Sequence, residues 1–332
     1  GKLIIESARL ALKDIDTKLL EIHPKDSGTN PTKTLKSAFE LKEMGINIII
    51  GPIFYKNLSY LEEVKDVIFL SLTNKTIDLP KNVISSGVNA TSQLNTIKKF
   101  ITSNEINKTI FLTPKLDYEA EVKKGIKNSK IKISKHYVYE NEPTKLTSQI
   151  EKITNYKRRK QNLLDEIKRV EESDLIDKEK QLEKLEKKYT IGNVNFDSVI
   201  ISDFNENLKS VITSLLYTDV SPKKKHFISF NQWFDESILE EKNIQPIYYP
   251  SINKENLENF RKKFSERFKK EPNHLSLLSY DLVGLIYYLT LKNELDDLNK
   301  IFKKKNTFKG KIGIFEIKNN KIHHKLNLYK VD

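Results

Sequence analysis

Short, almost wholly apolar segments alternate along this chain with longer amphipathic ones, and this alternation constrains the fold more than any other feature. The apolar segments include 67–70, 109–112 and 198–202, and the amphipathic ones include 91–103 and 205–217, which have apolar residues near a 3.6-residue period. Strands that are apolar on both faces belong to parallel sheets that helices cover on both sides. At about 150 residues per domain, a chain of 332 residues is long enough for two such units. The pattern therefore predicts an α/β fold with two doubly wound parallel-sheet lobes.

Residues 155–191 break this rhythm, because they combine many charged side chains with helical spacing and contain no strand pattern. Two apolar stripes run through the segment, and Ser173-Asp174 between them is typical of a helix N-cap. Stripes of this kind pack against each other in an antiparallel helical hairpin. The residues predicted for its seam are Tyr156, Leu163, Ile167, Val170, Leu175, Leu182, Leu185 and Tyr189. The hairpin is either a solvated insertion or a protruding arm that binds a partner.

The chain is strongly basic, with 58 Lys and Arg against 45 Asp and Glu and a net charge of +13. Only six of the 58 basic residues are Arg, the residue that base-edge readout and bidentate phosphate contacts favour. The Lys are spread along the chain and do not gather with aromatic residues in one stripe. Nucleic acid is therefore not an expected partner, and a solvated basic surface is the expected consequence of the charge.

Motifs of catalysis are missing from the sequence, which has no G-x-S-x-G, no H-E-x-x-H, no phosphate-binding glycine loop and no cysteine. The six His are scattered, and His323 and His324 lie on a predicted strand, where neighbouring side chains point to opposite faces. We therefore predict a protein that is not an enzyme and that has no cofactor and no metal site. The longest apolar stretches, 46–54 and 282–291, are about ten residues long, whereas a membrane-spanning helix needs about 20, so no membrane span is predicted.

Three segments are informative when they are read together: SARLALKDID at 7–16, INIIIGPIF at 46–54 and YDLVGLIYYL at 280–289. Their order and character resemble the type I periplasmic binding proteins, the family of branched-chain amino-acid receptors. This resemblance implies two doubly wound lobes joined by a three-stranded hinge. The implied division puts residues 1–88 and 251–310 in lobe one, residues 89–250 and 311–332 in lobe two, and the helical hairpin 155–191 within lobe two.

A closer resemblance rests on GPIF at 51–54, YKRRKQNLLDEI at 156–167 and FDSVIISD at 196–203, which are similar to segments of bacterial penicillin-binding protein activators. It implies a non-catalytic periplasmic module that regulates peptidoglycan synthesis through protein contacts, with a peptidoglycan synthase as its partner. The alternative that the wider family implies is the solute-binding receptor of an amino-acid ABC transporter, whose partner is the permease. The small ligand would be an amino acid or a wall fragment. Whether a lipid anchor precedes Gly1 is left open.

The resemblance also implies a ligand cleft at the carboxyl ends of the strands, where ligands of doubly wound folds bind. The turn 71–74 would hold a carboxylate, Tyr118 and Phe204 would close over the ligand, and Asp203 would replace the acidic partner of an ammonium group, because Asn231 and Gln232 are neutral. The expected cleft residues are Phe54, Tyr55, Ser71, Thr73 and Asn74 in lobe one, and Tyr118, Asp203, Phe204, Asn231 and Gln232 in lobe two.

Overall fold

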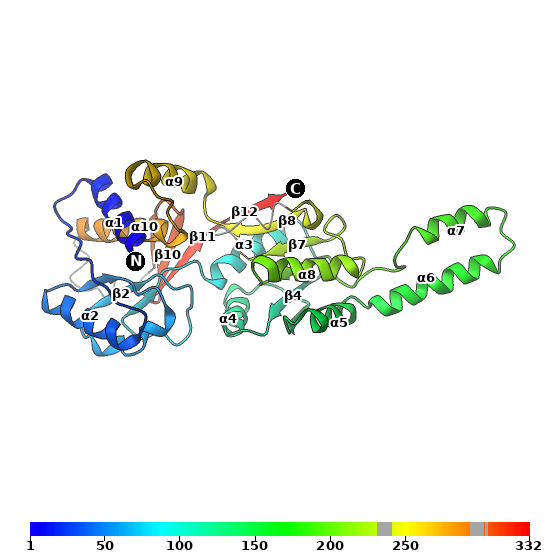
Figure 1. Cartoon of the computed structure of the whole chain (residues 1–332), viewed down its shortest axis with the longest axis horizontal. Helices are drawn as coiled ribbons and strands as arrows, with labels where there is room; N and C mark the ends of the chain where they lie inside the picture. The colour runs from blue at the N-terminus through cyan, green and yellow to red at the C-terminus, as the bar shows by residue number, and fades with distance from the viewer. Residues whose placement is uncertain (231–240, 293–301, 303–304) are drawn as a thin grey trace. The chain divides into compact units, whose positions relative to one another are not determined.

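The computed structural model of the chain describes residues 1–230, 241–292, 302 and 305–332 (Figure 1). The chain divides into two compact units, each with its own six-stranded sheet. The first unit contains residues 1–96, 120–131 and 250–327, and the second contains residues 97–119, 132–249 and 328–332. The prediction of an α/β fold with two parallel-dominated sheets is confirmed.

The first sheet has the strand order β1-β2-β3-β11-β10-β9. Strands β1 to β3 and β11 run parallel, and β10 and β9 add an antiparallel edge. The bounds of the strands are β1 (Ile48–Ile50), β2 (Ile68–Ser71), β3 (Val83–Ser85), β9 (Asn306–Lys309), β10 (Ile314–Lys318) and β11 (Lys321–Lys325). The helices of this unit are α1 (Lys2–Ile15), α2 (Pro31–Glu43), η1 (Tyr55–Leu58), η2 (Leu61–Glu63), α9 (Lys254–Phe268) and α10 (His274–Leu291).

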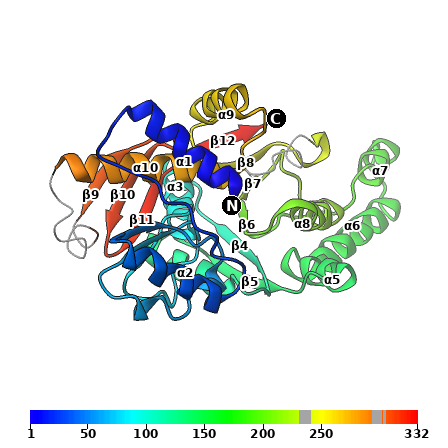
Figure 2. The same ribbon diagram turned by 60° about the vertical axis from the view of Figure 1, so that its left-hand side comes forward.

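Helices cover both faces of this sheet, as continuous apolar strands require. Ile49 packs in a cluster with Ala38 of α2, whereas its neighbour Ile50 packs in a cluster with Ala11 of α1 and Val283 of α10. Because successive side chains of a strand point to opposite faces, α2 lies on one side of the sheet, and α1 and α10 lie together on the other (Figure 2).

The second sheet has the order β12-β8-β7-β6-β4-β5, with every described pairing from β5 to β8 parallel. Its strands are β4 (Thr109–Pro114), β5 (Lys135–Tyr139), β6 (Ser198–Ile201), β7 (His226–Ser229), β8 (Ile247–Ser251) and β12 (Asn327–Val331). Strands β4 and β6 are buried along their whole length. The remaining described helices are α3 (Ala90–Ser103) and α4 (Glu119–Ser129), which lie partly in the first unit, and five of the second unit: α5 (Pro143–Ile153), α6 (Tyr156–Glu171), α7 (Lys178–Glu186), α8 (Asn205–Tyr217) and η4 (Lys242–Ile244).

The division of the chain differs from the expected one at its C-terminal end, because 311–327 clusters with the first unit and only 328–332 with the second. The reason is the register of β11, whose Lys321 pairs with Ser85 of β3 and thereby extends the first sheet. Side chains reinforce this placement: the Asn89 amide donates to the carbonyl of Ile322, and the backbone N–H of His324 donates to the Ser92 hydroxyl. Residues 89–96 and 120–131, expected in lobe two, also cluster with the first unit.

Helix α10 is the one described helix that is long and apolar enough to cross a membrane by length and composition. Half of it is buried inside the protein, and its Asp281 carboxylate accepts the backbone N–H groups of Lys311 and Ile312 at 2.7 Å each. Burial raises the pKa of Asp281 to about 6, although these two hydrogen bonds lower it. A buried carboxylate that organises the loop before β10 identifies α10 as a core helix of the first unit.

Helices α6 and α7 form the predicted hairpin and lie side by side (Figure 1). Leu163, Val170 and Leu185 are buried in its seam, with Ile167 and Leu182 packed against them. The prediction of the seam was wrong at the other three positions. Tyr156 packs on Tyr217 of α8, while Leu175 and Tyr189 are exposed. The predicted cap is also wrong, because the Ser173 hydroxyl donates to the carbonyl of Val170 and ends α6, so α7 begins only after Asp177.

His324 is a buried histidine in the core of the first unit. Its Nε2 lies 2.8 Å from the carbonyl oxygen of Ser86, which can only accept, so the ring carries its proton on Nε2. Burial lowers the pKa of His324 to about 4, and the carbonyl of Ser86 opposes this by favouring the charged ring. The ring is therefore neutral in the folded protein at neutral pH.

This histidine makes the folded protein sensitive to acid. The unfolded chain takes up the proton near pH 6.5 and the folded one only near pH 4, so between these values the unfolded state binds more protons and the free energy of unfolding falls with falling pH. The difference in stability between the wild type and His324→Gln should shrink by about 3 kcal/mol from pH 7 to pH 4. Urea unfolding of both proteins measures it. The contribution of Asp281 to stability changes with pH in the opposite direction, but it is the same in both proteins and cancels in the difference. A difference in stability that stays constant from pH 7 to pH 4 would contradict the assignment.

Candidate functional site

The first unit presents its expected ligand residues at one edge of the sheet. Strands β1 and β2 are parallel neighbours, so the loop with Phe54 and Tyr55 and the turn with Ser71 to Asn74 leave from the same edge. Phe54 and Asn74 are exposed, whereas Ser71 and Thr73 are buried. The Tyr55 hydroxyl donates to the carbonyl of Ile77 at 3.0 Å, which attaches the first loop to the second.

Hydrogen bonds inside the unit already use the polar groups of this turn. The Ser71 hydroxyl donates to the carbonyl of Pro52 at 2.8 Å and accepts the N–H of Thr73. The carbonyl of Thr73 accepts both the Ser85 hydroxyl and the N–H of Gly87, at 2.9 Å each. A Cβ atom at Gly87 would lie 2.6 Å from that carbonyl oxygen, so only glycine allows so close an approach. The turn is a packed structural junction.

The second unit brings Tyr118, Asp203 and Phe204 together where β4 and β6 end. The rings of Tyr118 and Phe204 meet edge to face with their centroids 5.9 Å apart, and the Tyr118 hydroxyl donates to the carbonyl of Ser202 at 2.8 Å. Asp203 is buried, and its carboxylate accepts the Tyr139 hydroxyl at 2.7 Å and the N–H of Phe204 at 2.9 Å. Burial raises the pKa of Asp203, and these two hydrogen bonds lower it.

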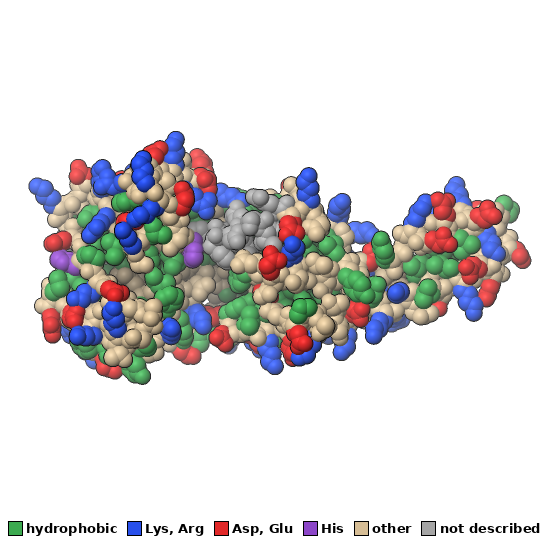
Figure 3. Space-filling model, in the orientation of Figure 1, with side chains coloured by type: hydrophobic (Ala, Val, Ile, Leu, Met, Phe, Trp, Pro, Cys, Tyr) green, Lys and Arg blue, Asp and Glu red, His purple; other side chains and the backbone are tan. Residues whose placement is uncertain are grey.

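Asn231 and Gln232 lie outside the described residues, so the structure does not place them. Among the residues that it does place, no three His, Asp or Glu side chains gather in a way that could hold a metal ion. His323 and His324 follow each other on β11, and only His324 contacts the carbonyl of Ser86. On the face in Figure 3, Lys and Arg side chains are dispersed among acidic ones.

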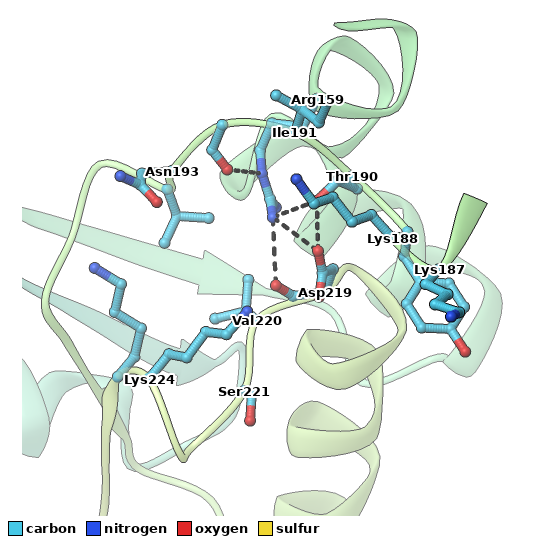
Figure 4. Close-up of a pocket in the computed structure, with 14 residues that line it drawn as sticks. Arg159, Lys187, Lys188, Thr190, Ile191, Asn193, Asp219, Val220, Ser221 and Lys224 are labelled. Carbon is cyan, nitrogen blue, oxygen red and sulfur yellow. Dashed lines mark hydrogen bonds and ion pairs between the residues drawn. The ribbon is translucent and has the colours of Figure 1, made fainter. Parts of the chain in front are cut away.

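A crevice of about 350 Å³ lies in the second unit at the base of the helical hairpin, and Arg159 of α6 is one of the residues that line it (Figure 4). This guanidinium is buried and donates to four oxygens: the carbonyls of Gly192, Thr218 and Asp219 and the hydroxyl of Thr190. Burial lowers the pKa of Arg159, and the Asp219 carboxylate, 3.7 Å away, raises it. The Thr190 hydroxyl in turn donates to Asp219 at 2.6 Å. One side chain thus ties both ends of the hairpin to the body of the unit.

Sequence reasoning missed three residues that organise these sites: Tyr139, Arg159 and Glu121. Tyr139 is the last residue of a predicted strand, a position from which its hydroxyl reaches Asp203 after the end of β6, two strands away in the sheet. No sequence signal marks Arg159, because three of the six Arg of the chain lie in the same helix and one of them is its neighbour Arg158. Glu121, in the charged helix α4, carries no signal that distinguishes it from its neighbours.

No protein-family model matches the chain, and a search of curated proteins finds no match either. Solved structures are similar over nearly its whole length. An ABC transporter substrate-binding protein from Desulfitobacterium hafniense in complex with Leu has a TM-score of 0.63 at 13% identity, covering 99% of this chain and 93% of that one. The LpoA (YraM) C-domain from Haemophilus influenzae, described as a regulator of PBP1A, has a TM-score of 0.62 at 12% identity, covering 99% and 92%.

An extracellular ligand binding receptor from Desulfohalobium retbaense has a TM-score of 0.57 at 12% identity, and here 99% of this chain spans only 54% of the longer one. Identities this low show the fold alone. These neighbours are two binding proteins and a regulator. The chain has the two-lobe α/β fold of the type I periplasmic binding proteins, as the resemblance of its sequence implied.

Proposed function

We propose that this protein is a non-catalytic periplasmic module that regulates peptidoglycan synthesis through protein contacts, and that the helical hairpin 155–191 is its contact element. The observation that carries the proposal is the anchoring of this hairpin by Arg159, which is 6% exposed, lies near the start of the segment and is bonded to its far end and to the body of the unit. A solvated insertion needs no such anchor, since its own seam would suffice. A rigid base suits an element that must be presented in one orientation.

The hairpin also exposes apolar side chains that its seam leaves free (Figure 3). Ile176 in the loop between α6 and α7 is fully exposed, and Leu164, Leu175 and Tyr189 are between 43% and 76% exposed. Apolar and aromatic side chains on a rigid support contribute most of the binding energy in protein interfaces. Their position on an anchored arm supports a role in binding a protein.

The likeness to the LpoA C-domain supports the identity of the partner that we propose, a peptidoglycan synthase, since that neighbour is described as a regulator of PBP1A. A module with this fold would act by binding one conformation of the synthase more tightly than another, which shifts the population of the enzyme. The periplasmic location is part of this proposal.

A second candidate function is that of a solute-binding receptor for an amino-acid transporter, and the edge-to-face pair of Tyr118 and Phe204 favours it, as does the neighbour that was solved with Leu. The hydrogen-bonding groups argue against it. Ser71 and Asp203 already have partners within their own units, so neither is free for the carboxylate or the ammonium of an amino acid.

A thermal-shift screen against the common amino acids and peptidoglycan fragments separates these candidates. A ligand at a hundred times its dissociation constant would stabilise the protein by about 2.7 kcal/mol and raise the melting temperature by several degrees. We expect no selective shift with any amino acid. A shift with one amino-acid class that Thr73→Ala or Tyr118→Ala abolishes would replace our proposal with the receptor.

The contact role of the hairpin is tested by photocrosslinking in cells. A photoreactive residue in place of Ile176 should give a crosslink to a peptidoglycan synthase, and Leu164→Glu in the same protein should weaken it at least about tenfold, because a carboxylate would have to be buried in the interface. Met44, which is 57% exposed in the first unit, is the matched control site and should give no such product. Equal yields from the two sites would remove the hairpin from the proposal.

The anchor itself is tested by replacing Arg159. Arg159→Ala leaves three carbonyls and the Thr190 hydroxyl without their donor and should lower the free energy of unfolding by about 3 kcal/mol. Amide hydrogen exchange in 188–194 should become faster, because the end of the hairpin is released. Arg158→Ala, the exposed neighbour, is the control and should change neither. Chemical denaturation with exchange mass spectrometry gives both quantities, and similar behaviour of the two variants would show that Arg159 is no anchor.

A further inference from the structure

Glu121 of helix α4 is buried in the first unit, and its carboxylate is bound by the loop that follows the turn 71–75. Its Oε1 accepts the backbone N–H groups of Thr76 and Ile77 at 2.5 and 2.7 Å, and its Oε2 accepts the Thr76 hydroxyl at 2.8 Å. Among the described residues of the first unit, no other element forms a hydrogen bond with the Glu121 side chain. Three donors from two consecutive residues therefore converge on one carboxylate.

The surroundings of this carboxylate are positively charged. Lys124, one turn further along α4, donates to the carbonyl of Thr76 at 3.0 Å. Lys321 of β11 lies close enough to interact with both charges: burial lowers its pKa, repulsion from Lys124 lowers it further, and attraction to Glu121 raises it. The Tyr55 hydroxyl holds the carbonyl of Ile77, so the loop that provides the donors is fixed on its other side.

Two main-chain N–H groups and a hydroxyl, with an ammonium group beside them, are donors that suit a carboxylate. The donors come from consecutive residues of a loop that the Tyr55 hydroxyl also holds. When that carboxylate is removed, two buried N–H groups lose their acceptor and two Lys lose their counter-charge. Both losses favour the uptake of another anion of the same shape.

We propose that Thr76 and Ile77, with Lys124 beside them, form a carboxylate-binding site that the protein fills with its own Glu121. The side chain acts as a built-in ligand that holds helix α4 to the loop 73–77. In the wild type the attached Glu121 side chain occupies these donors, and a free carboxylate binds them once that side chain is removed. The site takes a small monocarboxylate in place of the glutamate side chain, and the inference is independent of the contact role proposed for the hairpin.

The test is chemical rescue with acetate as the probe. Glu121→Ala should lower the melting temperature by several degrees, and acetate should restore most of this loss, whereas chloride at the same ionic strength should not. The wild type, whose site is filled, should respond equally to the two salts. Glu43→Ala, which removes an exposed glutamate from helix α2 of the same unit, is the matched control and should show neither the loss nor the rescue.

Amide resonances give a local readout that a general salt effect would not move. The N–H protons of Thr76 and Ile77 should shift upfield in Glu121→Ala and return toward their wild-type positions as acetate is added. If Glu121→Ala does not fold, Glu121→Gln keeps the shape of the side chain without its charge, and the same two resonances are followed in it. Rescue by chloride as good as that by acetate, or unchanged resonances of Thr76 and Ile77 on titration, would overturn the proposal.

Discussion

Strands that are buried on both faces impose the constraint on which the rest of this structure depends. Strands β2, β4 and β6 are buried at every residue, so each needs a helix on both sides, and the chain can supply one only by a crossover after every strand. This requirement produces the two doubly wound sheets. It also places the strand ends, with their loops, at one edge of each sheet, where the candidate site residues lie.

Three polar side chains buried near these edges are satisfied within their own units. Asp203 is bound by Tyr139 and the N–H of Phe204, Ser71 by Pro52, and Glu121 by the loop at Thr76. An unpaired polar group in such a place would cost more than a hydrogen bond contributes, so each has an internal partner. Residues that would contact a ligand in an amino-acid receptor act here as structural junctions, which is the physical basis for proposing a function through protein contacts.

Arg159 extends the same principle to the hairpin. A buried guanidinium needs several acceptors at once, and the C-terminal end of the segment and the loop after α8 supply them. The seam of the hairpin, by contrast, needs only apolar packing of Leu163, Val170 and Leu185. The hairpin is thus held together by hydrophobic burial and held in place by hydrogen bonds to one charged side chain.

The amino-acid sequence by itself determined the fold class, the helical hairpin and the positions of Ser71, Thr73, Tyr118, Asp203 and Phe204 at strand ends, because hydrophobic periodicity is a local property that follows from burial. Only the tertiary structure decided that 311–327 joins the first sheet, since the pairing of Lys321 with Ser85 joins segments 236 residues apart, as 321 minus 85 gives. The hydrogen-bond partners of Glu121, Asp203 and Arg159 were likewise decided only by the tertiary structure. A hydrogen bond between distant residues depends on where the chain brings them together, and no local pattern encodes that.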